Sequence, residues 1–218
     1  MKYINDLNLK WAVTDLAEKE FTCGYCEEHN RSDKGMVLIE TASDEYHQEG
    51  GIYICAHCKM PTFLWEDMQV PGVKIGSKIS EVSSEITTLY DEARLAYSAG
   101  AYTGAVLLCQ KILMNASVEL GAEPNLSFVD YVDYLDENHY VTAKIQTWVN
   151  RLRLEDSEES HEIAIKTKQH AADLIKFCEM VMKINFEYPR LLEGLQIEEA
   201  EPETDFENES ENDFESVF

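Results

Sequence analysis

The sequence predicts an α+β protein: a small cysteine-rich β unit, then an all-α bundle of four or five helices, then an acidic tail. Three observations lead to this fold class. Two Cys-x-x-Cys pairs lie near the N-terminus among β-branched and aromatic residues, which favour strands. After a connector rich in Pro and Gly, the apolar spacing changes from two residues to about 3.6 residues. The last segment contains acids and no bases. The expected domains are residues 1–68, a connector at 69–77, a helical bundle at 78–190 and a disordered tail at 191–218.

Composition narrows the class of protein further. The chain has 218 residues, of which 44% are hydrophobic, so it can bury a core. Its longest uninterrupted apolar stretch, residues 105–109, is far shorter than the ~20 residues that span a bilayer. The N-terminal residues 1–11 contain Asp and Lys where a signal peptide needs an apolar segment. We therefore expect a soluble, cytoplasmic protein with no membrane partner.

The cysteine spacing predicts a metal site. Two identical pairs are separated by 28 residues, and they consist of Cys23, Cys26, Cys55 and Cys58. Each pair can hold a metal ion from one tight turn, and two pairs complete a tetrahedral thiolate shell. Without a secretory signal, one zinc ion is favoured over disulfides. Four cysteines leave no position for a catalytic water, so the zinc is expected to be structural.

Other ligand arrangements stay open at this stage. The four cysteines could instead be free thiols or a redox pair. Three nearby histidines, His29, His47 and His57, could each replace a cysteine if the geometry disfavours it.

The residues around the cysteines predict a small β fold. Gly24 lies between the first two ligands, where a tight turn needs a permissive backbone. Residues 36–41, 52–55 and 62–65 have the composition of strands, and Gly50-Gly51 is typical of a turn. Together these features predict a small zinc ribbon, in which two hairpins clamp one ion. With so small a core, the metal would supply much of the folding free energy.

Helical periodicity then continues over about 110 residues. Gly and Pro interrupt it at positions that suit helix ends. The two remaining cysteines, Cys109 and Cys178, stand singly in apolar helical patterns and are expected to be buried. The expected helices are one that contains residues 82–96 and ends at Gly100, followed by residues 102–120, 127–137, 141–154 and 161–188.

Residues 89–113, LYDEARLAYSAGAYTGAVLLCQKIL, resemble the helical hairpin of a widespread prokaryotic family of unknown function. Members of that family often carry an N-terminal zinc ribbon and are sometimes fused to restriction-type nucleases. The family belongs to the HEPN superfamily of four-helix folds, which includes metal-independent endoribonucleases. The resemblance covers about residues 20–188. It implies a HEPN-like bundle, a homodimer formed through it, and a role in prokaryotic nucleic-acid metabolism or genome defence.

The same resemblance implies a candidate ribonuclease site. In active members, an Arg and a His a few residues apart meet at a dimer cleft and act on RNA phosphate. The matching residues here are Arg153 and His161, with Arg151 as a second candidate. The sequence departs from the family pattern, because seven residues separate the pair and four of them are acids that would repel phosphate. These departures favour a structural turn at the start of a helix over catalysis.

The C-terminal segment is the most acidic part of the chain. Residues 191–218 contain eleven Asp and Glu and no Lys or Arg, and the formal net charge of the whole chain is −24. Three aromatic residues, Phe206, Phe214 and Phe218, interrupt the acids. Acids with spaced aromatics can dock on a basic groove that has an apolar pocket. The alternatives are a solubilising tail, or a tail that occupies a basic groove of its own chain.

The leading hypothesis is a non-enzymatic interaction protein whose tail binds a protein partner with a basic surface. The rival hypothesis is an endoribonuclease that uses Arg153 and His161. A third is a DNA-mimic inhibitor, which would need its acids on a rigid surface. Residues 1–190 alone carry a net charge of −13, so general coating of nucleic acid is disfavoured and RNA remains only a candidate ligand of the bundle.

Overall fold

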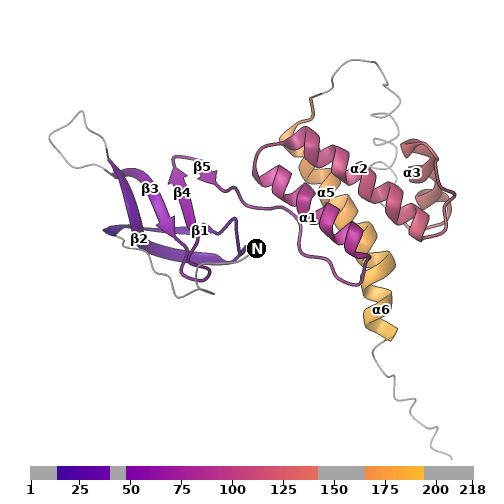
Figure 1. Ribbon diagram of the computed structural model, residues 1–218, viewed down its shortest axis with the longest axis horizontal. Coiled ribbons are helices and arrows are strands. Elements are labelled where there is room, and N and C mark those ends of the chain that lie inside the picture. Colours follow the sequence, from indigo (N-terminus) through magenta and orange to yellow (C-terminus); the bar gives the residue numbers. More distant parts are fainter. Residues whose placement is uncertain (1–13, 40–47, 142–164, 194–218) are drawn as a thin grey trace, which may run out of the picture.

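The computed structural model describes residues 14–39, 48–141 and 165–193. An antiparallel sheet occupies the N-terminal side of the molecule and a group of helices the other side, with one extended segment joining them (Figure 1). We call the described residues 14–70 the sheet unit, residues 71–83 the connector and residues 84–193 the bundle.

The sheet unit is larger than the sequence predicts. Its five strands follow one another across the sheet in chain order, each antiparallel to the next. The expected small zinc ribbon of two hairpins is therefore wrong. The strands are β1 (Thr14–Thr22), β2 (His29–Ile39), β3 (Gln48–Ile54), β4 (Pro61–Trp65) and β5 (Met68–Val70).

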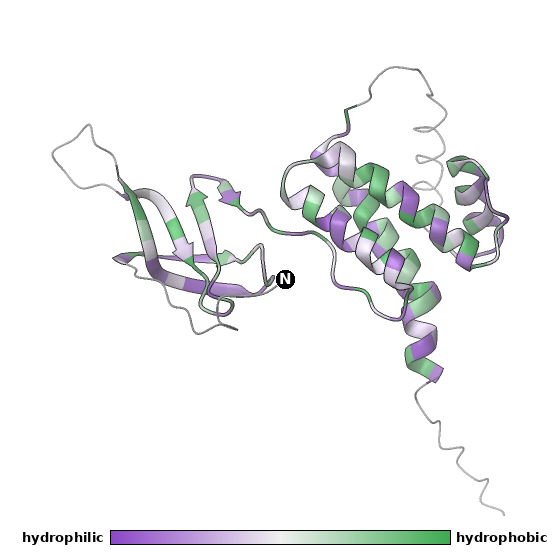
Figure 2. Ribbon diagram, in the orientation of Figure 1, coloured by the Kyte–Doolittle hydropathy of each residue, from purple (hydrophilic) through white to green (hydrophobic). Residues whose placement is uncertain are grey.

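Strand β1 was missed because it is mostly polar and exposed, unlike a half-buried strand with alternating apolar residues (Figure 2). Its backbone pairs with that of β2, and exposed charged side chains also pair across the two strands. Lys34 on β2 pairs with Asp15 on β1, and the Arg31 Nε atom lies 2.5 Å from the Glu18 carboxylate. Cross-strand ion pairs of this kind depend on the register of two strands, which periodicity within one strand cannot reveal.

The two glycines expected to form a turn lie instead within the central strand β3. Gly50 is opposite Leu38 and Trp65, and Gly51 is opposite Val37 and Leu64. A Cβ atom on Gly51 would lie 2.5 Å from the Met36 carbonyl oxygen. The glycines therefore permit close approach of neighbouring strands rather than a reversal of the chain.

The bundle confirms three of the expected helices closely. Its elements are α1 (Ser84–Ser98), α2 (Tyr102–Glu119), α3 (Phe128–Glu137), α5 (Lys168–Met182), the π-helical turn η3 (Lys183–Glu187) and α6 (Tyr188–Glu193). In the described residues, the last helix begins at Lys168, where the Thr167 side chain caps it, and continues beyond 188 to Glu193. The helix expected at 141–154 lies outside the described residues apart from Val141.

The core of the bundle forms where α2 packs against α1, α3 and α5. Both Cys109 and Cys178 are fully buried there, as expected, and the Cys178 thiol lies 3.5 Å from the Cys109 carbonyl oxygen. None of the helices in the described ranges combines the length and hydrophobicity needed to cross a lipid bilayer.

Candidate metal centre

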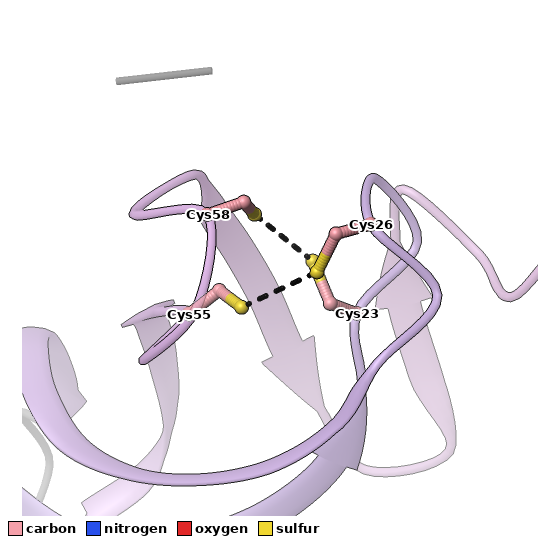
Figure 3. Close-up of side chains that lie close together, drawn as sticks. All are labelled: Cys23, Cys26, Cys55 and Cys58. Atoms are coloured by element: carbon pink, nitrogen blue, oxygen red, sulfur yellow. Dashed lines mark hydrogen bonds between the residues drawn. The ribbon is translucent and has the colours of Figure 1, made fainter. Parts of the chain in front are cut away.

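Two turns of the sheet bring the four cysteines together. Cys23 and Cys26 lie in the turn between β1 and β2, and Cys55 and Cys58 lie in the turn between β3 and β4. The side chains point from these two turns toward one shared centre (Figure 3). Because β2 and β3 are neighbours in the sheet, pairs far apart in sequence meet at one end of it.

The sulfur positions match a tetrahedral metal shell. The Sγ atoms of Cys23 and Cys58 are 3.7 Å apart, as are those of Cys26 and Cys55, and all four lie within 4.8 Å of one another. A tetrahedron with metal–sulfur bonds of about 2.3 Å has edges of about 3.8 Å. A disulfide would require a separation of about 2.05 Å. The four cysteines are therefore close enough to hold a metal ion, and they are spaced as its ligands rather than as disulfides.

The two turns share one backbone design. The amide nitrogen of Glu27 bonds to the Cys23 carbonyl at 2.9 Å, and that of Lys59 bonds to the Cys55 carbonyl at 3.1 Å. Glu27 and Lys59, one residue after each second ligand, have left-handed φ values of 68° and 59°. These residues, and not Gly24, carry the unusual conformation.

Gly24 has a different reason to be glycine. The matching position in the second turn is Ala56, so the turn itself tolerates a side chain. A Cβ atom on Gly24 would lie 2.6 Å and 2.5 Å from the carbonyl oxygens of Pro71 and Gly72. The first turn is therefore packed directly against the connector.

The electrostatics of the cluster favour a cation. Burial raises the pKa of the Cys26 and Cys58 thiols, although backbone amides near each oppose the effect. For Cys23, burial also acts to raise the pKa, but hydrogen bonds from the Cys26 and Tyr25 amides outweigh it and lower the pKa overall. Four thiolates this close repel one another unless a cation lies between them, so metal binding and deprotonation go together.

An ionic clasp links this centre to the bundle. Glu27, next to Cys26, pairs through one carboxylate oxygen with the Arg94 guanidinium on α1. Its other oxygen lies 3.5 Å from the Lys74 ammonium in the connector. Arg94 is fully buried, whereas the Glu27 side chain is 23% exposed. We call these three residues the clasp.

Arg94 also holds the connector directly. Its Nε atom donates to the Ile75 carbonyl at 3.0 Å, and Nη2 donates to the Gly76 carbonyl at 2.7 Å. Its guanidinium lies 5.8 Å from the ring centre of Tyr90. A Cβ atom on Gly76, at φ 74°, would lie 2.4 Å from the Tyr90 hydroxyl. One buried cation thus fixes the first cysteine turn, the connector and α1 together.

One local feature of the sequence indicates the clasp. Ile86, Tyr90 and Ala93 mark the buried face of α1, and Arg94 falls on that same face. A charged residue on an apolar helical face needs a buried partner. The sequence could have indicated that a partner exists, but not that it is Glu27.

The other candidate residues stand as follows. His29 and His57 are exposed and do not belong to the four-cysteine cluster. His47 lies outside the described residues, as do Arg151, Arg153 and His161. Phe206, Phe214 and Phe218 also lie outside them. Among the described residues, the four cysteines form the cluster of side chains that is close enough to hold a metal ion.

Comparison with known proteins places the chain in no family. No protein-family model, no curated protein and no solved structure matches it. Any function must therefore be argued from the geometry of this chain.

Proposed function

We propose that this chain is a non-enzymatic zinc-binding interaction protein, in which one structural zinc ion stabilises the sheet unit and the acidic tail binds a protein partner with a basic surface. The observation that carries the proposal is the cluster of four cysteines with 3.7 Å separations between sulfurs of opposite turns. The setting in prokaryotic nucleic-acid metabolism or genome defence rests on the sequence resemblance alone.

Zinc is the metal that best suits the ligand set. Four cysteines from two short turns form a common structural zinc shell, and zinc in such sites is almost always tetrahedral. Soft thiolates disfavour magnesium and calcium, which prefer oxygen ligands. Iron is the main competitor, because it also binds four thiolates in a tetrahedron.

A structural role follows from the closed shell. All four coordination positions are taken by protein sulfur, so a bound water or substrate has no place on the ion. Cys23, Cys55 and Cys58 are buried. What the ion supplies is a cross-link between the β1–β2 and β3–β4 turns.

The partner half of the proposal rests on the tail sequence. Residues 194–218 hold ten Asp and Glu, no Lys or Arg, and three Phe residues spaced among the acids. Long-range attraction between this charge and a basic surface speeds encounter, and apolar pockets for the Phe rings provide specificity.

Metal content and spectroscopy test the zinc half. Elemental analysis of the purified full chain should find one zinc and negligible iron per chain. Cobalt substitution should give the d–d absorption of a tetrahedral thiolate complex. Cys55→Ser should lose the ion, whereas Cys109→Ala, which removes a buried bundle cysteine, should retain it. Iron in place of zinc, or equal loss in both variants, would contradict the assignment.

Affinity capture tests the partner half. The full chain should recover a specific basic protein from the native host, and the chain ending at residue 193 should not. The matched control replaces Phe206, Phe214 and Phe218 with Ala and keeps every acid. If this control captures the partner as well as the full chain does, charge alone acts and the proposed aromatic recognition is wrong.

A further inference from the structure

A groove separates the sheet unit from one end of the bundle. Its volume is about 990 Å³. One wall comes from β5 and the connector, and the other comes from the turn between α1 and α2, close to the start of α5 (Figure 1). Its apolar lining residues include Val70, Val73, Leu95, Tyr97 and Tyr102.

The walls of the groove are apolar and partly exposed. Val70 is 54% exposed, Val73 is 43% exposed and Leu95 is 45% exposed. Tyr97 and Tyr102 form a tilted aromatic pair with ring centres 5.5 Å apart. Aliphatic side chains facing an aromatic pair suit the insertion of another aromatic ring.

The charge of the groove differs from that of the rest of the chain. Its charged lining residues are two lysines, Lys74 and Lys168, and one acid, Asp67, whereas acids outnumber bases by 24 over the whole sequence. Helix α2 begins at Tyr102 with no side-chain cap and no acid in its first turn. Its positive N-terminal end therefore adds to the charge of Lys168, since Lys74 is already paired with Glu27. An anionic segment is favoured here.

The tail of the same chain has the complementary chemistry. It presents the tripeptide Asp-Phe-Glu twice, at residues 205–207 and 213–215. In each copy one aromatic ring lies between two carboxylates. The ring matches the apolar walls, and the carboxylates match Lys168 and the start of α2.

The length of chain that precedes each copy of the Asp-Phe-Glu tripeptide distinguishes the two copies. Helices α5 and α6, joined by η3, run from Lys168 at the groove to Glu193. These 26 residues span about 39 Å at 1.5 Å per residue, so the tail must return by about that distance. Phe206 is 13 residues beyond Glu193, and its maximum reach of about 45 Å covers that distance only when the chain is nearly fully extended. Phe214 is 21 residues beyond Glu193, and a linker of that length can span about 70 Å, so Phe214 can reach the groove without full extension.

We propose that the segment Asp213-Phe214-Glu215 docks in this groove of its own chain, with the Phe214 ring against the apolar walls and its flanking carboxylates toward Lys168 and the start of α2. This goes beyond the proposed function, because the tail can dock on its own chain whether or not it also binds a partner. A docked tail would be withheld from that partner, so docking would set how readily the partner binds.

Methyl NMR spectra of the full, metal-loaded chain test the docking. Deleting residues 194–218 should shift the methyl resonances of Val70, Val73 and Leu95, and Phe214→Ala should reproduce most of that shift. Phe206→Ala, which alters the same tripeptide, should leave the resonances near their wild-type positions. On the groove side, Val73→Glu should release the tail, whereas Val118→Glu, at a 40% exposed apolar site outside the groove, should not.

Each alternative occupant predicts a different result. Unchanged resonances after deletion would overturn the proposal. Equal effects of Phe206→Ala and Phe214→Ala would replace specific docking with diffuse attraction. Shifts that disappear on dilution would mean that the groove binds the tail of a second copy, and the intramolecular proposal would be wrong. Failure of partner capture, in contrast, would leave these resonances unaffected and would count only against the proposed function.

Discussion

The sheet unit and the bundle are stabilised in different ways. The described sheet unit buries seven apolar residues, three of which are the candidate metal ligands Cys23, Cys55 and Cys58. The bundle buries a continuous apolar cluster shared by α1, α2, α3 and α5. A unit whose core consists largely of ligands depends on its metal, whereas a unit with its own apolar core does not. The two units therefore differ in what removal of the ion does to them.

The clasp links the stability of the bundle to that of the sheet unit. Arg94 belongs to the bundle and is fully buried, yet its carboxylate partner Glu27 lies one residue from a metal ligand. If the sheet unit unfolds, Arg94 loses that partner while it remains inside the bundle. A buried charge that loses one of its partners is costly, although Asp91 on α1 stays 3.5 Å from the guanidinium. The bundle should therefore survive the loss of metal in a weakened state.

The largest expected effect comes from removing the metal. A strong chelator, or Cys55→Ser, should unfold the sheet unit, because structural zinc supplies on the order of 10 kcal/mol to small domains. Helical circular dichroism should persist, while amide exchange in β1 to β4 becomes fast. Since the cysteine thiols must lose their protons to bind the metal, metal affinity should also fall as the pH is lowered. Loss of helicity together with the sheet signal would show that the two units form one cooperative fold.

Glu27→Gln tests the clasp itself. Removing the carboxylate leaves Arg94 with Asp91 at 3.5 Å and the Ile75 and Gly76 carbonyls, and the free energy of unfolding of the bundle should fall by about 1.5–3 kcal/mol. Urea unfolding followed by helical circular dichroism measures the change, and metal content should stay at one ion per chain. The control is the same measurement on metal-free protein.

If the clasp couples the two units, the effects of chelation and of Glu27→Gln on bundle stability should not be additive. Chelation should destabilise the wild-type bundle by about the amount that Glu27→Gln does, and should add little in the Glu27→Gln variant. Additive losses of stability would mean that metal binding stabilises the bundle through contacts other than the clasp.

Gly24→Ala should have a smaller effect. Its Cβ atom would press on the Pro71 and Gly72 carbonyls, and such overpacking costs about 1–3 kcal/mol. The matched change in the other turn, Ala56→Gly, meets no connector and should alter stability by less than about 1 kcal/mol. Thermal unfolding of both variants with zinc bound compares them. Equal effects would show that turn conformation, not contact with the connector, determines the residue at position 24.

The smallest expected effect is confined to the bundle. Ser127 and Asp130 form a reciprocal cap at the start of α3. Ser127→Ala should cost about 1 kcal/mol at neutral pH, measured by urea unfolding, and should leave the sheet unit unchanged. The Ser127 hydroxyl and amide lower the pKa of Asp130, so its contribution is present above pH ~4 and is lost as the pH falls through the lowered pKa. The difference between the variant and the wild type should therefore narrow at acidic pH, and a constant difference would contradict this role.

Local patterns in the sequence were enough to predict much of this protein. The Cys-x-x-Cys spacing predicted the four-cysteine cluster, since a pair of ligands in one turn is a local arrangement. Helical periodicity with caps predicted α2 and α3 to within one residue, and it placed Cys109 and Cys178 in the bundle core. In each of these cases the pattern that carried the prediction lies within a few residues along the chain, although the two cysteine pairs meet only in the fold.

Only the tertiary structure decided the features that depend on distant segments. Strand β1 is held by its backbone pairing with β2, Gly51 is required by the approach of neighbouring strands, and Gly24 is required by the connector. The pairing of Glu27 with Arg94 joins residues 67 positions apart. A single sequence records that such residues are charged or small, but the register of a sheet and the packing of one unit against another determine which partners they meet.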